Sequence, residues 1–232
     1  QNTIPTIEIA TVEKHLYTLA SDAMEGRKAG TPGIEKAAQY IETVFEDIGL
    51  TTYNDLPTYR QNFKAMGLDL FNVIGVLEGK SKKNEFVVIS AHYDHLGVKK
   101  EGTGDLIFNG ADDDASGTTA VLTLAQYFKE LDANERTLIF VAFTAEEMGL
   151  LGSRHFGEDV DASQFIAGIN IEMIGKDSSY GPNTAWLTGF DRSDFGTIIQ
   201  KNLTGTSYTV HPDPYPEQNL FFRSDNASLA QL

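Results

Sequence analysis

The chain contains no cysteine. This absence excludes disulfide bonds, thiolate metal sites and a cysteine nucleophile. Such a composition fits an exported protein that relies on its hydrophobic core for stability, so we expect a periplasmic, extracellular or lipid-anchored location. The sequence begins with Gln1 rather than Met, and we expect a preceding leader or tag to have been removed.

Positive charge is scarce, and so are long apolar runs. The 232 residues include 18 Lys and Arg against 33 Asp and Glu, which gives a formal net charge of −15. Because phosphate binding needs a basic face, we expect no nucleic-acid partner. The longest apolar runs are the length of a strand, so the sequence predicts no membrane span.

The hydrophobic fraction of 41% suits a single globular domain over residues 1–232. Strands that alternate with helices indicate a three-layer α/β/α fold with a mixed, largely parallel central sheet. A hairpin-like pair formed by the first two strands favours the mixed sheet. The apolar periodicity predicts strands at 71–79, 85–91, 137–143, 166–174 and 184–189, and helices at 31–50, 116–128, 149–156 and 193–203.

Acidic residues and histidines gather at predicted strand ends. The segments are "SAHYDHLG" (90–97), "NGADDDASG" (109–117), "TAEEMG" (144–149) and "INIEMIG" (169–175). Taken singly, each has an ordinary structural explanation, such as an interior histidine, a capped helix or a solvated turn. Ligands of open α/β sheets bind beyond the carboxyl ends of the strands, however, so we expect these side chains to lie close together.

Several carboxylates at one place are costly unless metal ions neutralise them. Imidazole and carboxylate ligands without thiolate are typical of catalytic zinc. The sequence therefore predicts one or two divalent ions, with a spare carboxylate as general base. It contains no G-x-S-x-G, P-loop or H-E-x-x-H motif, which argues against a serine hydrolase, a nucleotide-binding P-loop and a zincin helix.

The H-x-D, G-A-D-D-D-A-S-G and A-E-E-x-G-L-L-G-S patterns occur together and in this order. They resemble the co-catalytic zinc aminopeptidases of the bacterial leucyl aminopeptidase type. That family also includes glutaminyl cyclase, glutamate carboxypeptidase and the catalytically inactive transferrin receptor domain. The resemblance extends from 19–33 to 221–230 and implies the zinc-exopeptidase fold, up to two Zn²⁺ ions and peptide substrates.

The resemblance also implies a ligand set. His92 would bind one metal, and Asp113, the middle acid of its triplet, would bridge both metals. Glu147 would bind the second metal. Glu172 falls where the family usually has Asp on the first metal, so its longer side chain implies an altered geometry. His95 matches a position that is not a ligand in the family.

Two further carboxylates receive roles from the resemblance. Asp94 would hold the imidazole of His92, and Glu146 would be the general base that activates a metal-bound water. The implied activity is that of an aminopeptidase, which hydrolyses the N-terminal residue of a peptide through a metal-bound hydroxide. Two alternatives stay open: cyclisation of an N-terminal glutamine, and a catalytically impaired member that acts as a binding module.

Members of the family carry a further histidine ligand beyond the segment that matches 221–230. No histidine of this sequence lies there, and His211 is well upstream. We therefore expect a catalytic domain that is truncated at its C-terminus. With only Asp113 and Glu147 as ligands, the second metal position would be incomplete and weak, because catalytic zinc usually has three protein ligands.

Overall fold

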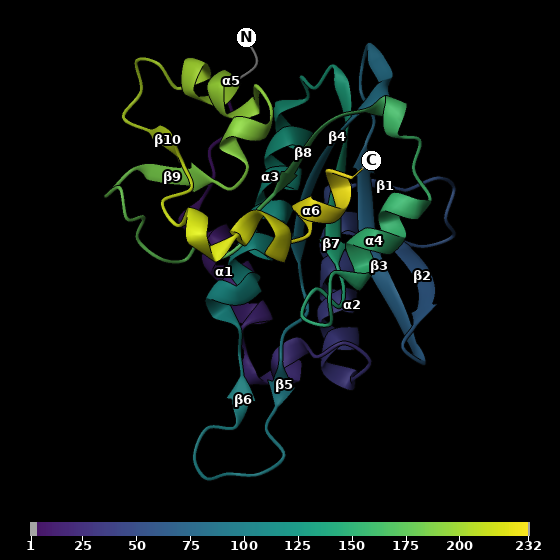
Figure 1. Ribbon diagram of the computed structural model, residues 1–232. Coiled ribbons are helices and arrows are strands. Elements are labelled where there is room, and N and C mark those ends of the chain that lie inside the picture. Colours follow the sequence, from purple (N-terminus) through teal and green to yellow (C-terminus); the bar gives the residue numbers. More distant parts are fainter. Residues whose placement is uncertain (1–3, 232) are drawn as a thin grey trace.

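The computed structural model describes residues 4–231, and its centre is a six-stranded mixed sheet (Figure 1). The strand order is β1-β3-β7-β4-β8, and β2 pairs with β3. Only β3 runs against the direction of the other strands, because it is antiparallel to β1, β2 and β7, whereas β7, β4 and β8 are parallel. The strands are β1 (Thr51–Thr52), β2 (Arg60–Ala65), β3 (Leu68–Leu77), β4 (Lys82–His92), β7 (Arg136–Phe143) and β8 (Phe165–Asn170).

The predicted pairing of the first two long strands is wrong. β3 and β4 are not hydrogen-bonded neighbours, since β7 lies between them, antiparallel to β3 and parallel to β4. The reason is the apolar character of β7, in which every residue from Thr137 to Phe143 is buried. A strand that is apolar on both faces is most stable at the centre of a covered sheet.

Helices cover both faces of the sheet, so the three-layer prediction is confirmed (Figure 1). On one face lie α1 (Ile9–Leu19), α2 (Pro32–Ile48) and α3 (Gly117–Leu131). On the other lie α4 (Leu151–Glu158) and α6 (Asn226–Leu229), which contact each other and the strands β3 and β8. Helix α2 begins with a proline in its first turn and ends before Gly49, whose φ of 77° suits a left-handed cap.

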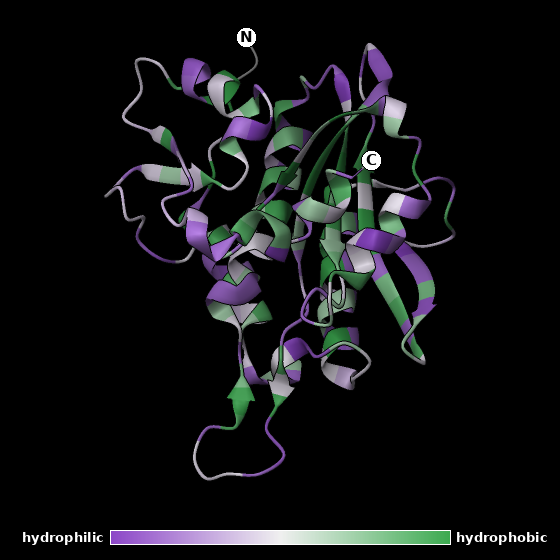
Figure 2. Cartoon of the chain, viewed as in Figure 1, coloured by the Kyte–Doolittle hydropathy of each residue, from purple (hydrophilic) through white to green (hydrophobic). Residues whose placement is uncertain are grey.

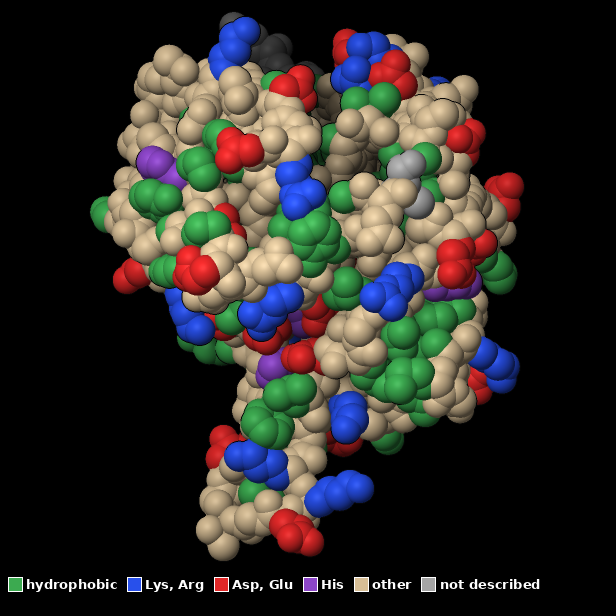
Figure 3. Space-filling model, in the orientation of Figure 1, with side chains coloured by type: hydrophobic (Ala, Val, Ile, Leu, Met, Phe, Trp, Pro, Cys, Tyr) green, Lys and Arg blue, Asp and Glu red, His purple; other side chains and the backbone are tan. Residues whose placement is uncertain are grey.

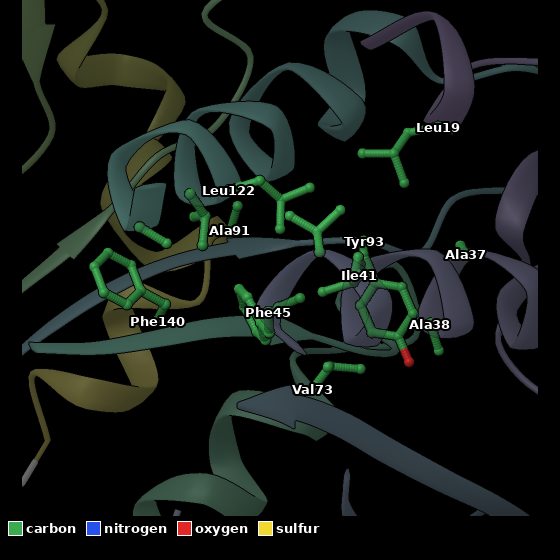
Figure 4. Packing of buried hydrophobic residues seen from close by; sticks show 14 of the residues in the cluster. Leu19, Ala37, Ala38, Ile41, Phe45, Val73, Ala91, Tyr93, Leu122 and Phe140 are labelled. Carbon is green, nitrogen blue, oxygen red and sulfur yellow. The ribbon is translucent and has the colours of Figure 1, made fainter. Parts of the chain in front are cut away.

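The two larger apolar cores lie on opposite sides of the sheet (Figure 2). Alternate residues of β7 point to opposite faces. Phe140 packs with Ile41 and Phe45 of α2 in the larger core, which Figure 4 shows from close by. Phe143 packs against Phe156 of α4 in the smaller core. Both cores fix the central strands, and with them the ends from which the polar clusters emerge.

Two smaller units extend from this body (Figure 1). Strands β9 (Thr184–Leu187) and β10 (Thr209–Pro212) pair in parallel beside α5 (Phe195–Asn202) and form an outer lobe. Strands β5 (Gly97–Val98) and β6 (Ile107–Phe108) form a projecting arm. Within residues 4–231, no helix has the length and apolarity that crossing a membrane requires. Short irregular or 3₁₀ turns span Asp22–Arg27, Ala111–Ser116, Ala162–Gln164, Phe190–Arg192, Pro216–Gln218 and Leu220–Arg223.

Candidate metal centre

The predicted site residues leave the sheet at neighbouring strand ends. His92 is the last residue of β4, Glu146 and Glu147 follow β7, and Glu172 lies two residues beyond β8. Because β7, β4 and β8 are parallel, these ends meet at one edge of the sheet. Histidine and acidic side chains gather above the base of the projecting arm, where Figure 3 shows them at the surface.

The loop before α3 brings Asp113 to the same edge, and its neighbours anchor the loop to the segment after β8. Asp114 is fully buried, and its Oδ1 accepts a hydrogen bond from the Met173 amide at 3.2 Å. The Oδ1 of Asp112 accepts one from the Gly175 amide at 2.8 Å. The two outer acids of the triplet therefore connect the loop before α3 to the segment after β8, and the middle acid, Asp113, faces the site.

Three donors converge at a first metal position. The Nε2 atom of buried His92 lies 3.1 Å from Oδ1 of Asp113, and a carboxylate oxygen of Glu172 is close enough that all three atoms lie within 4.8 Å of one another. The buried Nε2 has no hydrogen-bond partner. The Nε2 and Oδ1 atoms are therefore close to each other but are not aligned for a hydrogen bond, as expected for two atoms that face a common centre.

A second group shares Asp113 and includes a residue outside the predicted ligand set. His95, Asp113 and Glu147 also offer three donor atoms within 4.8 Å of one another. The Nδ1 atom of His95 lies 2.7 Å from Oε1 of Glu147, yet it is buried without a hydrogen-bond partner. The two groups together form a pair of adjoining positions with one carboxylate in common.

Asp94 connects His92 with the pair of glutamates. Its Oδ1 lies 3.5 Å from Nδ1 of His92, and its backbone carbonyl lies nearer to the same nitrogen, at 3.2 Å. The carboxylate also accepts hydrogen bonds from the amides of Glu146, at 3.0 Å, and Glu147, at 3.3 Å. Asp94 therefore sets the turn after β7 as well as contacting the histidine.

Glu172 is held by a chain of polar side chains. Ser224 donates a hydrogen bond to its Oε2 and accepts one from Asn170, at 2.8 Å. Asn170 in turn accepts a hydrogen bond from Ser90 at 2.8 Å. This chain fixes the position of a glutamate that extends one methylene further than the aspartate expected there.

Burial raises the pKa of several of these carboxyl groups. Burial is the largest effect on Glu146 and raises its pKa to about 8. The nearby His92 lowers this pKa, whereas the carboxylates of Asp225, Glu172 and Asp94 raise it. Burial also raises the pKa of Glu172, and it raises that of Asp225 to about 7. Acids that crowd each other in this way favour a bound cation.

A buried arginine fixes the backbone on which these residues stand. Arg27 is fully buried, and its guanidinium donates hydrogen bonds to the carbonyl groups of Tyr93 (2.9 Å), Asn109 (2.7 Å), Gly110 (2.9 Å) and Leu19 (2.5 Å). It thus joins the His92 segment to the Asp113 loop. No pattern in the sequence indicates this role of Arg27, although its segment, 19–33, belongs to the resemblance.

The residues present fit one or two zinc ions. The donors are imidazole nitrogens and carboxylate oxygens, which zinc accepts, and two of the nitrogens are buried without hydrogen-bond partners. The structure brings together all the predicted ligands, His92, Asp113, Glu147 and Glu172, and it adds His95. The predicted weakness of the second position stays a prediction.

Known proteins resemble this chain in sequence and in fold. A sequence model described as peptidase family M28 matches residues 72–232. Aminopeptidase YwaD of Bacillus subtilis is 32% identical over 108 residues, which are 45% of this chain and 22% of that protein. The matched part of this chain thus spans well under two thirds of that relative.

Solved structures share the fold over nearly the whole chain. BSAP, a zinc aminopeptidase from Bacillus subtilis, superposes with a TM-score of 0.74 at 14% identity, covering 99% of this chain and 84% of that one. The glutaminyl cyclase of Porphyromonas gingivalis gives 0.69 at 16% identity, covering 97% and 80%. The family match begins within β3 and includes every element after it, with all the residues of both metal positions, and the chain therefore belongs to peptidase family M28.

Proposed function

We propose that this chain is a zinc-dependent exopeptidase of the aminopeptidase type, which removes the N-terminal residue from peptides. One observation carries the proposal: His92, Asp113 and Glu172 converge beside Glu146, a partly buried carboxylate that neither group of metal donors uses. A ligand set and a separate base are the two parts that metal-assisted hydrolysis needs.

His92, Asp113 and Glu172 would hold zinc at the first position, and Asp113 would share a second ion with Glu147. Bound zinc polarises a substrate carbonyl and makes water more acidic. The Ser224 contact restricts Glu172, and the Asp94 contacts restrict both His92 and the turn that carries Glu146 and Glu147. Rigid ligands and a fixed base reduce the reorganisation that the reaction requires.

Glu146 is the general base of this proposal. Its carboxylate accepts a proton from the attacking water and returns it to the amine of the leaving peptide, so no net proton is gained or lost by the enzyme. Burial raises the pKa of Glu146 to about 8 when no metal is bound, and the positive charge of bound zinc would favour the ionised form that a general base needs. The surrounding carboxylates attract the protonated amine of a peptide N-terminus.

A second candidate is cyclisation of N-terminal glutamine, which the fold shared with the glutaminyl cyclase of Porphyromonas gingivalis keeps open. The separate base Glu146 next to Glu147 favours hydrolysis, as does the sequence relationship to aminopeptidase YwaD. A catalytically impaired member that only binds a partner is a third possibility, and the intact donor set argues against it.

Hydrolysis of aminoacyl-p-nitroanilides, with and without a chelator, tests the proposal. Release of p-nitroaniline that a chelator abolishes and zinc restores would support an aminopeptidase. A parallel assay follows ammonia release from a peptide with N-terminal glutamine, which reports cyclisation. Ammonia release without nitroanilide hydrolysis would replace the proposed function by the second candidate, and inactivity in both assays would favour the third.

We further propose that the protein acts outside the cytosol. The absence of cysteine is compatible with an oxidising compartment and supports this location. Fractionation of the cells that produce the protein would test it, and recovery with the cytosolic fraction would contradict it.

A further inference from the structure

We propose that the projecting arm binds a carboxylate of the peptide substrate, on the leaving side of the scissile bond, through Lys99 and the ring of Phe108. The inference rests on the proposed function and deepens it, because it names the peptides that the site favours. These are short peptides whose terminal carboxylate reaches the arm, or longer ones with an acidic side chain at the same distance. The chemistry common to both is a carboxylate beside a lysine ammonium.

The arm begins and ends at the metal centre. Strand β5 comes two residues after His95, and β6 directly precedes the loop that carries Asp113. Arg27 fixes both ends of the arm. Its carbonyl oxygen accepts a hydrogen bond from the amide of His95 at 3.1 Å, and its guanidinium donates one to the carbonyl of Asn109 at 2.7 Å. The base of the arm therefore has a fixed position beside the metal donors.

A row of side chains leads from the metal donors to the arm. Nδ1 of His95 lies 2.7 Å from Oε1 of Glu147, the separation of an ion pair. The ring of Phe108 packs edge-on against this imidazole, with 6.4 Å between the ring centres. Nζ of Lys99 lies over the Phe108 ring, 4.8 Å from its centre. Figure 3 shows hydrophobic side chains between the cluster of histidine and acidic side chains and the basic side chains of the arm.

Lys99 is restrained by its aromatic neighbour rather than by an acid. The cation–π contact limits the orientations of this long, exposed side chain, which lowers the entropy cost of binding an anion. The ion-paired lysines of residues 4–231 do not include Lys99. Asp105, in the same hairpin loop, instead accepts a hydrogen bond from the amide of Ile107 at 3.0 Å. In a chain with a formal net charge of −15, this ammonium is a local attraction for an anionic group.

The charges around the site set the direction in which a peptide binds. Glu146 and Asp225 belong to neither group of metal donors, and Asp225 directly precedes α6. Figure 1 shows that the arm projects away from α6. A peptide has a positive N-terminus and a negative C-terminus at neutral pH. Its amine is attracted to these acids and its carboxylate to Lys99, so the residues after the scissile bond lie along the arm. An extended peptide advances by about 3.3 Å per residue, and Lys99 therefore selects for length.

Peptides that differ only in their C-terminal group test the inference. Leucine followed by one to four glycines is assayed with the zinc-loaded chain, as the free acid and as the amide. At one of these lengths we expect kcat/KM to be about 5-fold higher for the acid, the effect of one exposed ion pair. Lys99→Gln should bring this ratio to about one and leave the hydrolysis of leucyl-p-nitroanilide, which has no carboxylate, unchanged. Lys100→Gln is the matched control and should keep the ratio.

A second set of peptides identifies the source of the carboxylate. Amidated peptides of the preferred length with glutamate as the last residue have a carboxylate on the side chain but none at the C-terminus. If they are favoured over the amidated glycine peptides and Lys99→Gln removes this preference, the subsite binds acidic side chains. A preference confined to the free acids assigns it to the terminal carboxylate. Ratios near one at every length, or a preference that Lys99→Gln retains, would overturn the inference.

A binding measurement separates this inference from the proposed function. In zinc-loaded Glu146→Gln, where we expect turnover to be at least about 100-fold slower, calorimetric titration gives the Kd of each acid and amide. Tighter binding of the acid, lost when Lys99→Gln is added, supports the subsite. Together with an unaltered chain that hydrolyses no peptide, this result would refute only the peptidase. Hydrolysis of acids and amides with equal kcat/KM would support the peptidase and refute the subsite.

Discussion

The carboxylate of Asp94 accepts a hydrogen bond from the backbone amide of Glu146, at 3.0 Å. The same side chain lies 3.5 Å from the imidazole of His92, so one buried acid contacts both a proposed ligand and the turn that carries the proposed base. Asp94 therefore links the proposed ligand at the end of β4 to the proposed base that follows β7.

Asp94→Asn should lower both zinc affinity and turnover. The amide has one acceptor oxygen instead of two, so one backbone N–H after β7 loses its partner and the imidazole of His92 loses a nearby negative charge. Loss of such a supporting contact typically costs about 10- to 100-fold in affinity or activity. Zinc competition and kcat measure the two effects. Asp159→Asn is the matched control, and equal values for the two variants would contradict the role of Asp94.

Glu146→Gln should separate catalysis from metal binding. Glu146 belongs to neither group of donors, so the variant should bind zinc as the unaltered chain does. Removal of a general base costs on the order of 10²–10⁴ in rate, and we expect kcat for an aminoacyl-p-nitroanilide to fall by that factor. Glu147→Gln provides the contrast, because it should lose zinc from the second position. Turnover retained in Glu146→Gln would assign the base to another residue.

The sequence predicted most of the central fold because apolar periodicity reports burial directly. The helix at Pro32–Ile48 and the strand at Arg136–Phe143 match their predicted ranges within a few residues. It did not predict which strands pair, since β3 and β4 are adjacent in the chain but separated by β7. Such long-range pairing depends on which strand buries both faces, and neighbouring strands in a sequence offer no measure of that.

The sequence predicted most of the candidate site as well, because the fold class places the strand ends together. Ligands at the ends of parallel strands follow from the fold class, so His92, Glu147 and Glu172 could be grouped from their positions. His95 could not, because its ring orientation depends on the φ of Gly110 and on packing against Phe108. The contact of Ser224 with Glu172 joins residues 52 positions apart, and no local pattern reports it.

Arg27→Lys should destabilise the fold and loosen the site. A lysine cannot reproduce the planar set of donors that serves four carbonyl groups, so buried acceptors would lose their partners. Each unsatisfied buried group costs about 1–3 kcal/mol, and we expect the free energy of unfolding to fall by roughly 3 kcal/mol in urea denaturation. Exposed Arg154→Lys is the control. A loss of less than about 0.5 kcal/mol, the usual range of surface substitutions, would exclude a structural role for Arg27.

His15 should make the fold less stable in mild acid, independently of the metal site. Its ring is buried on α1, and its Nδ1 lies within hydrogen-bond distance, 2.8 Å, of the Tyr40 hydroxyl on α2. Burial, together with the charge of Lys14, lowers the pKa of His15 from 6.5 to about 4. In the unfolded chain the imidazole has its ordinary pKa, so between these two values the unfolded state takes up a proton that the folded state does not.

This difference in proton uptake makes the free energy of unfolding decrease as the pH falls. The contribution of His15 to stability is complete above pH 6.5 and is lost as the pH falls toward 4. The measurement is made with a chelator present, which removes effects of metal release. Between pH 6.5 and 4, we expect the free energy of unfolding of the unaltered chain to fall more than that of His15→Gln. The expected difference between the two decreases is on the order of 2 kcal/mol. Tyr40→Phe is the matched control: it removes the hydroxyl but keeps the buried imidazole, so it should lower stability at every pH and retain the acid dependence. Identical pH dependence in the unaltered chain and His15→Gln would show that protonation of this ring does not oppose folding.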